Sequence, residues 1–197
     1  MLLYDNPHSG NCYKVRLLLA HLGIDYQRRE LDVIDRSNRM EVLGDLNPGL
    51  RVPTIVLDDG RALAESNAIT FYFAEETPYL PEDRLERAHV LQWLFFEQYS
   101  HEPYIAVARF WSIAGITPSE DAAADKRRGG EAALAAMERH LRDRAFLVAD
   151  RYTIADIALY AYTHVAPEGG FELEAYPGIE KWLDRVAAQP GHIPLTA

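Results

Sequence analysis

The fold is decided by residues 2–23, which read LLYDNPHSGNCYKVRLLLAHLG. The first four of these residues are mostly apolar and predict a short strand, and a polar turn follows them. Apolar side chains at positions 15, 18, 19 and 22 then recur at the spacing i, i+3, i+4, i+7, which predicts an amphipathic helix that ends at Gly23. The pattern therefore places Ser9 at the junction between a strand and the helix that follows.

Residues downstream of this unit continue the alternation of strand and helix. Residues 26–33 predict a second strand and residues 36–46 a second helix. Residues 53–57 are rich in β-formers, the turn at 58–60 is typical of a hairpin, and a third helix begins near Glu65. The order is β-α-β, then a helix, then β-β-α, with a parallel pair followed by an antiparallel hairpin. This is a thioredoxin-like layout.

The remaining sequence has only helical periodicity. Residues 77–81 contain two prolines and predict a linker. We expect Pro103 to kink or break the long helical segment that surrounds it. The expected helical segments are 82–114, 119–142, one that begins at 153 and one around 179–186. The sequence therefore predicts two domains, an α/β thioredoxin-like domain over 1–76 and an all-α domain over 82–197.

Composition excludes several classes of function. A net charge of -10 argues against a surface that follows nucleic-acid phosphates. The N-terminus lacks the pattern of a signal peptide, and no apolar run approaches the ~20 residues that span a bilayer. The single cysteine, Cys12, cannot form an internal disulfide and suits a reducing compartment, and the seven histidines lack zinc-ligand spacing. We therefore expect a cytoplasmic protein without metal, membrane or nucleic-acid partners.

The turn that contains Ser9 is the first candidate site. Unpaired N–H groups and the helix dipole favour an anion at the beginning of a helix. Redox proteins of this fold place a Cys-x-x-Cys pair there, whereas this chain has Ser9 first and a cysteine only at the second position. A serine cannot exchange disulfides, so a thiolate at this place would have to belong to a bound ligand. The competing interpretation is that Ser9 only caps the helix.

Three further segments carry a family resemblance. They are NPGLRVP at 47–53, ESNAI at 65–69 and TIAD at 153–156. In order and spacing, over essentially the whole chain, they resemble the successive signatures of the cytosolic glutathione S-transferase family, in its bacterial-type members. The resemblance implies the glutathione S-transferase fold, with glutathione as co-substrate, a small hydrophobic electrophile as the second substrate, and a homodimer.

The resemblance also implies which residues handle the sulfur. Ser9 would donate a hydrogen bond to the glutathione thiolate, and Asn11 stands where a subset of bacterial transferases has an asparagine that could give a second one. Cys12 occupies the resolving position of redox relatives, and we interpret it as a buried structural thiol rather than a catalytic one.

The remaining parts of glutathione would bind to two other segments. Pro53 resembles the cis-proline of the family, which turns the main chain of Val52 toward the cysteinyl part. Ser66, helped by Glu65, would bind the γ-glutamyl end, although a Ser/Glu pair is also an ordinary helix start. Arg51 faces either the glycyl carboxylate or solvent, and the residues alone leave both open.

The electrophile would bind beside residues from both predicted domains, namely His8, Tyr104, Arg109 and Trp111. The Thr-x-x-Asp pattern at 153–156 predicts a capping box, which stabilises a helix and has no part in the chemistry.

Three functions stay open at this stage. The first is a transferase that adds glutathione to a hydrophobic electrophile, as in detoxification. The second is a glutathione-dependent disulfide reductase or peroxidase, which Ser9 and Asn11 would also suit. The third is a non-catalytic relative that serves as an interaction module.

Overall fold

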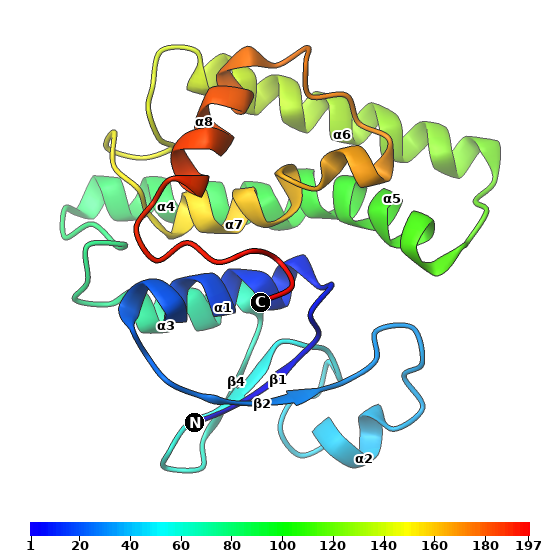
Figure 1. Ribbon diagram of the computed structural model, residues 1–197, viewed down its shortest axis with the longest axis vertical. Coiled ribbons are helices and arrows are strands. Elements are labelled where there is room, and N and C mark those ends of the chain that lie inside the picture. Colours follow the sequence, from blue (N-terminus) through cyan, green and yellow to red (C-terminus); the bar gives the residue numbers. More distant parts are fainter. The chain divides into compact units, whose positions relative to one another are not determined.

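The computed structural model describes residues 1–197, and the chain divides into two compact units (Figure 1). The first unit contains Met1–Glu75 together with Pro190–Ala197, and the second contains Glu76–Gln189. The predicted helical domain covered residues 82–197, whereas the structure groups Pro190–Ala197 with the first unit.

A four-stranded mixed sheet forms the centre of the first unit. Its strands are β1 (Leu2–Asp5), β2 (Gln27–Glu30), β3 (Thr54–Val56) and β4 (Ala62–Ala64), in the order β2-β1-β3-β4. The β1–β2 pair is parallel and the pairs β1–β3 and β3–β4 are antiparallel. The thioredoxin-like layout that the sequence predicts is confirmed.

Three helices cover this sheet. They are α1 (Gly10–Leu22) and α3 (Ser66–Ala74), which lie side by side on one side of it, and α2 (Arg39–Leu43) on the other (Figure 1). Successive side chains of β1 point to opposite faces, so Leu3 packs under α1 and α3 while Tyr4 packs toward α2. The beginning of α1 is thereby held at the end of β1.

The second helix is shorter than the predicted range of 36–46. Its preceding loop is organised by aspartate side chains: Asp32 accepts hydrogen bonds from the N–H of Ile34 at 2.7 Å, and Asp35 accepts one from the N–H of Ser37 at 2.9 Å. These side chains take the place of helical carbonyl acceptors, and the helix therefore begins only at Arg39.

The segment Pro190–Ala197 lies along α1 (Figure 1). The Tyr13 hydroxyl donates to the main-chain oxygen of Ile193 at 2.7 Å, and His21 Nδ1 lies 2.9 Å from the main-chain oxygen of Pro190. The tail is thus tied to the helix that carries the candidate site.

The second unit consists of helices. They are α4 (Arg84–Phe96), the π-helical η1 (Glu97–His101), α5 (Glu102–Ala114), α6 (Glu120–Leu141), α7 (Ile154–Thr163), the 3-10 helix η2 (Ala166–Gly169) and α8 (Pro177–Ala187). The interruption predicted at Pro103 is confirmed, because the chain passes through η1 immediately before this proline, which cannot donate an N–H to the preceding turn.

Helix α7 forms the core of the second unit, since each of its residues is buried. Its capping box is confirmed: the Thr153 hydroxyl accepts from the N–H of Ala155 and the Asp156 carboxylate accepts from the N–H of Thr153 at 2.9 Å. The TIAD segment therefore serves the folding of the helical unit.

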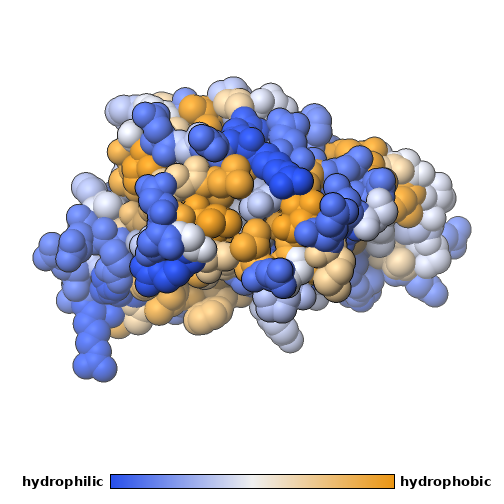
Figure 2. Space-filling view, turned by 90° about the horizontal axis from the view of Figure 1, so that it is seen from below, coloured by the Kyte–Doolittle hydropathy of each residue, from blue (hydrophilic) through white to orange (hydrophobic).

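Large apolar side chains also reach the surface. Figure 2 shows one face on which apolar residues are exposed between hydrophilic ones. On α4, Leu85 is 64% exposed and Phe95 70% exposed, and Leu91 is exposed beside them. No helix of the protein combines the length and the apolar character that crossing a membrane requires.

Candidate functional site

Ser9 begins helix α1. Its backbone is extended, with φ -81° and ψ 119°, and its Oγ accepts a hydrogen bond from the N–H of Cys12 at 3.3 Å. Ser9 therefore caps α1, which the structure shows without testing whether this is its only role. A hydroxyl that accepts through one lone pair can still rotate its own proton toward another acceptor, so capping does not use up the donor. Ser9 is half-buried, which leaves one side of it accessible.

Asn11 and Ser66 lie together although 55 residues separate them in sequence. The Ser66 hydroxyl donates to Asn11 Oδ1 at 3.2 Å, and Lys14 Nζ donates to Ser66 Oγ at 3.4 Å. Helices α1 and α3 therefore bring the predicted sulfur-binding residue beside the predicted γ-glutamyl-binding residue. The fully buried Lys14 places a positive charge at the beginning of α3, and sequence reasoning missed this contribution.

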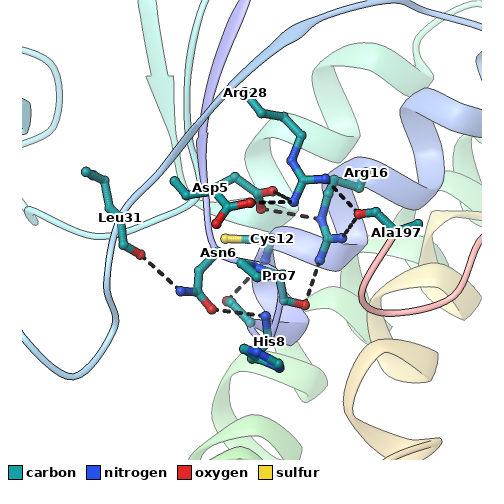
Figure 3. Close-up of polar contacts among 11 residues, drawn as sticks. Asp5, Asn6, Pro7, His8, Cys12, Arg16, Arg28, Leu31 and Ala197 are labelled. Atoms are coloured by element: carbon teal, nitrogen blue, oxygen red, sulfur yellow. Dashed lines mark hydrogen bonds and ion pairs between the residues drawn. The ribbon is translucent and has the colours of Figure 1, made fainter.

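Cys12 is fully buried beneath the same turn (Figure 3). Burial, together with the nearby Asp5 carboxylate, raises the pKa of the Cys12 thiol to about 12, although a hydrogen bond with Ser9 acts in the opposite direction. A thiol with this pKa stays protonated at neutral pH and is a poor nucleophile. The predicted burial of Cys12 is confirmed, and its structural role stays a prediction.

A buried ionic cluster lies next to the turn (Figure 3). The Asp5 carboxylate lies 2.6 Å from Arg28 Nη2 and 3.4 Å from Arg16 Nε, and the Asp5 and Arg16 side chains are fully buried. Both arginines also donate to the main-chain oxygen of Ala197, at 2.6 and 2.7 Å, and Arg16 donates to the carbonyl of Pro7 at 3.2 Å. The cluster thus connects strand β1, helix α1, the tail and the loop that leads to Ser9.

Asn6 holds the other side of this loop. Its Nδ2 donates to the carbonyl of Leu31 at 3.1 Å, and its Oδ1 accepts from the N–H of His8 at 3.0 Å (Figure 3). The backbone at His8 is therefore fixed, while its imidazole is exposed. An Asn-Pro pair after a short strand is the sequence signal that could have indicated this turn.

The segment 47–53 is organised by Asn47. Its Nδ2 donates to the carbonyl of Arg51 at 3.0 Å and to Thr54 Oγ1 at 2.9 Å, and its Oδ1 accepts from the N–H of Gly49 at 2.8 Å. The Val52–Pro53 bond is cis, as the resemblance implies. The Arg51 side chain is exposed, so both of its expected roles remain possible.

Glu65 precedes α3 with a left-handed backbone, φ 69° and ψ 115°. For a residue with a side chain this conformation costs about 1–2 kcal/mol, and such strain gathers at binding and active sites. Glu65 is exposed and the next residue, Ser66, is buried. Of the predicted glutathione ligands, Ser66 joins the network with Asn11, whereas Glu65 and Arg51 present their side chains to solvent.

The predicted electrophile residues of the helical unit lie on α5. Trp111, together with Ala108, Ile116 and Phe171, lines a cavity of about 250 Å³. Arg109 is buried and its Nε lies 2.7 Å from Glu168 Oε2. This ion pair gives Arg109 a structural contact.

Tyr104 is half-buried and lies five residues before Arg109 on α5. Lys126 Nζ lies 5.1 Å from the centre of its ring. His8 belongs to the first unit, so the pocket expected to combine it with Tyr104, Arg109 and Trp111 stays a prediction.

Two family models match the chain. The one described as "Glutathione S-transferase, N-terminal domain" matches residues 8–76, and the one described as "Glutathione S-transferase, C-terminal domain" matches residues 87–190. Among solved structures, a glutathione S-transferase from Pseudomonas fluorescens is 45% identical with a TM-score of 0.96, and the match covers 100% of this chain and 98% of that one.

Curated relatives show that similar chains carry other names as well. The disulfide-bond oxidoreductase YfcG of Escherichia coli is 26% identical over 195 residues, which cover 95% of this chain and 90% of that protein. Elongation factor 1-gamma of Artemia salina is 29% identical over 186 residues, 92% of this chain, and the match spans 43% of that factor's length. Both domain matches and the 45%-identical structure agree on one conclusion: the chain belongs to the glutathione S-transferase family.

Proposed function

We propose that the protein is a cytoplasmic glutathione transferase that stabilises the glutathione thiolate beside Ser9 for attack on a small hydrophobic electrophile. The observation that carries the proposal is the contact between Asn11 and Ser66 next to the helix start at Ser9. This contact brings together the residue types that would bind the sulfur and the γ-glutamyl end of one glutathione molecule.

The chemistry required of Ser9 is modest. A thiol with a reference pKa of ~8.5 is only ~3% ionised near pH 7, so complete ionisation raises the thiolate population by at most about 30-fold. The Ser9 hydroxyl would donate to the sulfur, the N-terminus of α1 would favour its negative charge, and Asn11 would offer a second donor. The thiolate then forms a bond to the electrophilic carbon and the leaving group departs with its electron pair.

The rest of glutathione would be held by main chain and charge. The Val52 backbone would pair with the cysteinyl unit like an added strand. Ser66, beside the buried Lys14, would receive the γ-glutamyl carboxylate, and the strained backbone at Glu65 supports a binding role for this turn. Arg51 remains the candidate for the glycyl carboxylate.

Within the helical unit, the electrophile would lie near Tyr104 and Trp111. Support comes from the half-buried aromatic rings on α5 and from the cavity beside Trp111. Arg109 would act there through its position on the same helix, although its charge is already paired with Glu168.

Calorimetry with glutathione and steady-state kinetics with an activated aryl halide test the proposal. Ser9→Ala should lower kcat by about 10-fold or more while changing the Kd for glutathione little, because the hydrogen bond to the thiolate is charge-assisted. Ser119→Ala is the matched control, since Ser119 caps α6 with the same 3.3 Å contact to a main-chain N–H. Equal losses of kcat in both variants, or no binding of glutathione at millimolar concentration, would contradict the proposal.

A glutathione-dependent disulfide reductase or peroxidase is the second candidate, and the similarity to the disulfide-bond oxidoreductase YfcG favours it. Reduction of a small mixed disulfide by glutathione, measured beside conjugation of the aryl halide, decides between the two activities. The similarity to elongation factor 1-gamma keeps a third candidate open, a non-catalytic interaction module, which would bind glutathione weakly or not at all and turn over neither substrate.

A homodimer is part of the same proposal. Leu85, Leu91 and Phe95 are exposed and lie within about 120° of the α4 circumference, at about 100° per residue. An exposed apolar stripe of this kind is typical of a protein interface. Phe95→Asp should halve the mass measured by analytical ultracentrifugation, and an unchanged mass would count against this stripe as the dimer contact.

A further inference from the structure

Four cationic side chains surround a cavity of about 640 Å³ that is built entirely from the helical unit. Arg142 and Arg144 follow the end of α6, and Lys181 and Arg185 lie four residues apart on α8. The volume is in the range of pockets that hold small organic ligands, about 300–1,000 Å³.

None of the four cations forms an ion pair, although acidic residues outnumber basic ones by 30 to 20 in the chain. One of the two acids in the lining is already engaged, because Glu138 Oε2 accepts from the N–H of Gly178 at 2.9 Å and of Ile179 at 3.1 Å. Glu138 therefore stabilises the beginning of α8 and forms no ion pair with the cations of the cavity, although its charge still counts in the lining.

A purely structural role accounts for two of the four. Arg185 Nε donates to the carbonyl of Ala145 at 2.8 Å, and Arg144 Nη1 donates to the carbonyl of His140 at 3.2 Å, so both satisfy main-chain oxygens near the end of α6. Arg142 and Lys181 line the same cavity without such contacts.

The arrangement is also unfavourable by itself. Lys181 and Arg185 stand at i and i+4 on one helix, a spacing at which like charges destabilise the helix. Arg142 and Arg144 add two more positive charges to the same cavity. An anion bound among the four would attract each of them and so offset this repulsion.

We propose that this cavity is a binding site for a small organic dianion, a phosphomonoester or a dicarboxylate. The lining carries four positive charges against two negative ones, from Glu138 and Asp143, so two negative charges on the ligand balance it. The volume is larger than one inorganic phosphate needs, and the site therefore has room for the organic part. It is independent of the residues assigned to glutathione.

Calorimetry at about 10 mM ionic strength tests the site with two probes, glucose 6-phosphate and succinate, because charges are little screened there. Glucose and acetate are the uncharged and singly charged controls. We expect one or both probes to bind with a Kd below about 1 mM, and the stronger probe identifies the headgroup class. The double variant Arg142→Ala/Lys181→Ala should weaken binding by about tenfold or more.

The control variant is Arg139→Ala, which removes the same charge from an exposed position of α6 outside the cavity. It should change the Kd by less than about twofold, because exposed charges interact weakly over a distance. Ser9→Ala should bind the probes as the unmodified chain does, whatever happens to glutathione turnover. Absence of binding for both probes at 10-fold the expected Kd, or equal losses in Arg139→Ala and the double variant, would overturn the proposal.

Discussion

Removal of the Asp156 side chain should strongly lower the free energy of unfolding of the helical unit. It is fully buried, and its carboxylate accepts hydrogen bonds from the N–H of Leu147 at 3.0 Å, from the N–H and hydroxyl of Thr153 at 2.9 and 3.2 Å, and from Trp182 Nε1 at 2.9 Å. It thereby joins the loop before α7, the cap of α7 and the core of α8.

The size of the effect of Asp156→Ala follows from these contacts. The substitution leaves three buried N–H donors without an acceptor, and each such donor costs about 1–3 kcal/mol. Loss of the capping box adds about 1 kcal/mol. Because neighbouring groups relax and some water enters, we expect a loss of about 3–5 kcal/mol, a large part of the 5–15 kcal/mol typical of a folded protein.

Urea unfolding followed by tryptophan fluorescence measures this loss in the right place. All three tryptophans, Trp93, Trp111 and Trp182, lie in the helical unit, so their emission does not report on the first unit. Asp184→Ala is the control, because it removes the same charge from an exposed position of α8. A loss below about 1 kcal/mol in Asp156→Ala, or one equal to the control, would refute the reasoning.

Three further outcomes follow from buried groups. Burial raises the pKa of Asp156 from 3.8 to about 6, so the folded state binds this proton more tightly than the unfolded chain does. The free energy of unfolding should therefore fall by about 3 kcal/mol as the pH rises from about 4 to about 6. Urea titrations at each pH measure this change, and Asp156→Asn should lack it. Arg16→Met should cost about 3 kcal/mol in the first unit, measured by amide hydrogen exchange, because Asp5 then keeps only Arg28; protection of β1 and α1 as in the unmodified chain would contradict this. Cys12 should resist a thiol reagent in the folded protein and react at once in urea, and rapid labelling of the folded state would show that its burial is wrong.

Local sequence chemistry was sufficient for much of the fold. The periodicity of residues 2–23 predicted β1 and α1, and Gly23 ends this helix with a left-handed backbone, φ 64°, that glycine adopts without strain. Thr153 and Asp156 were recognisable as a capping box because both partners stand within one helical turn. The predicted second helix was longer than α2. The side chains of Asp32 and Asp35 accept hydrogen bonds from nearby main-chain N–H groups, and the helix therefore begins later than predicted.

The candidate site was predictable in its residue types but not in its contacts. Ser9 and Ser66 were both expected at helix starts, and the structure has them there. The hydrogen bond between Ser66 and Asn11 depends on the packing of α1 against α3, which no local pattern contains. A lysine such as Lys14 would ordinarily face solvent, yet it is buried against Ser66.

The sequence by itself therefore determined the kind and order of the elements, the caps of the helices and the absence of a thiol at position 9. Each of these depends only on residues a few positions apart. Only the tertiary structure decided which charges meet. Asp5 reaches Arg28 because β2 pairs with β1, and it reaches Arg16 because α1 packs on a face of the same sheet. The tail adds the main-chain oxygen of Ala197, which both arginines contact. Such contacts depend on distances in space between segments remote in sequence, and periodicity carries no information about them.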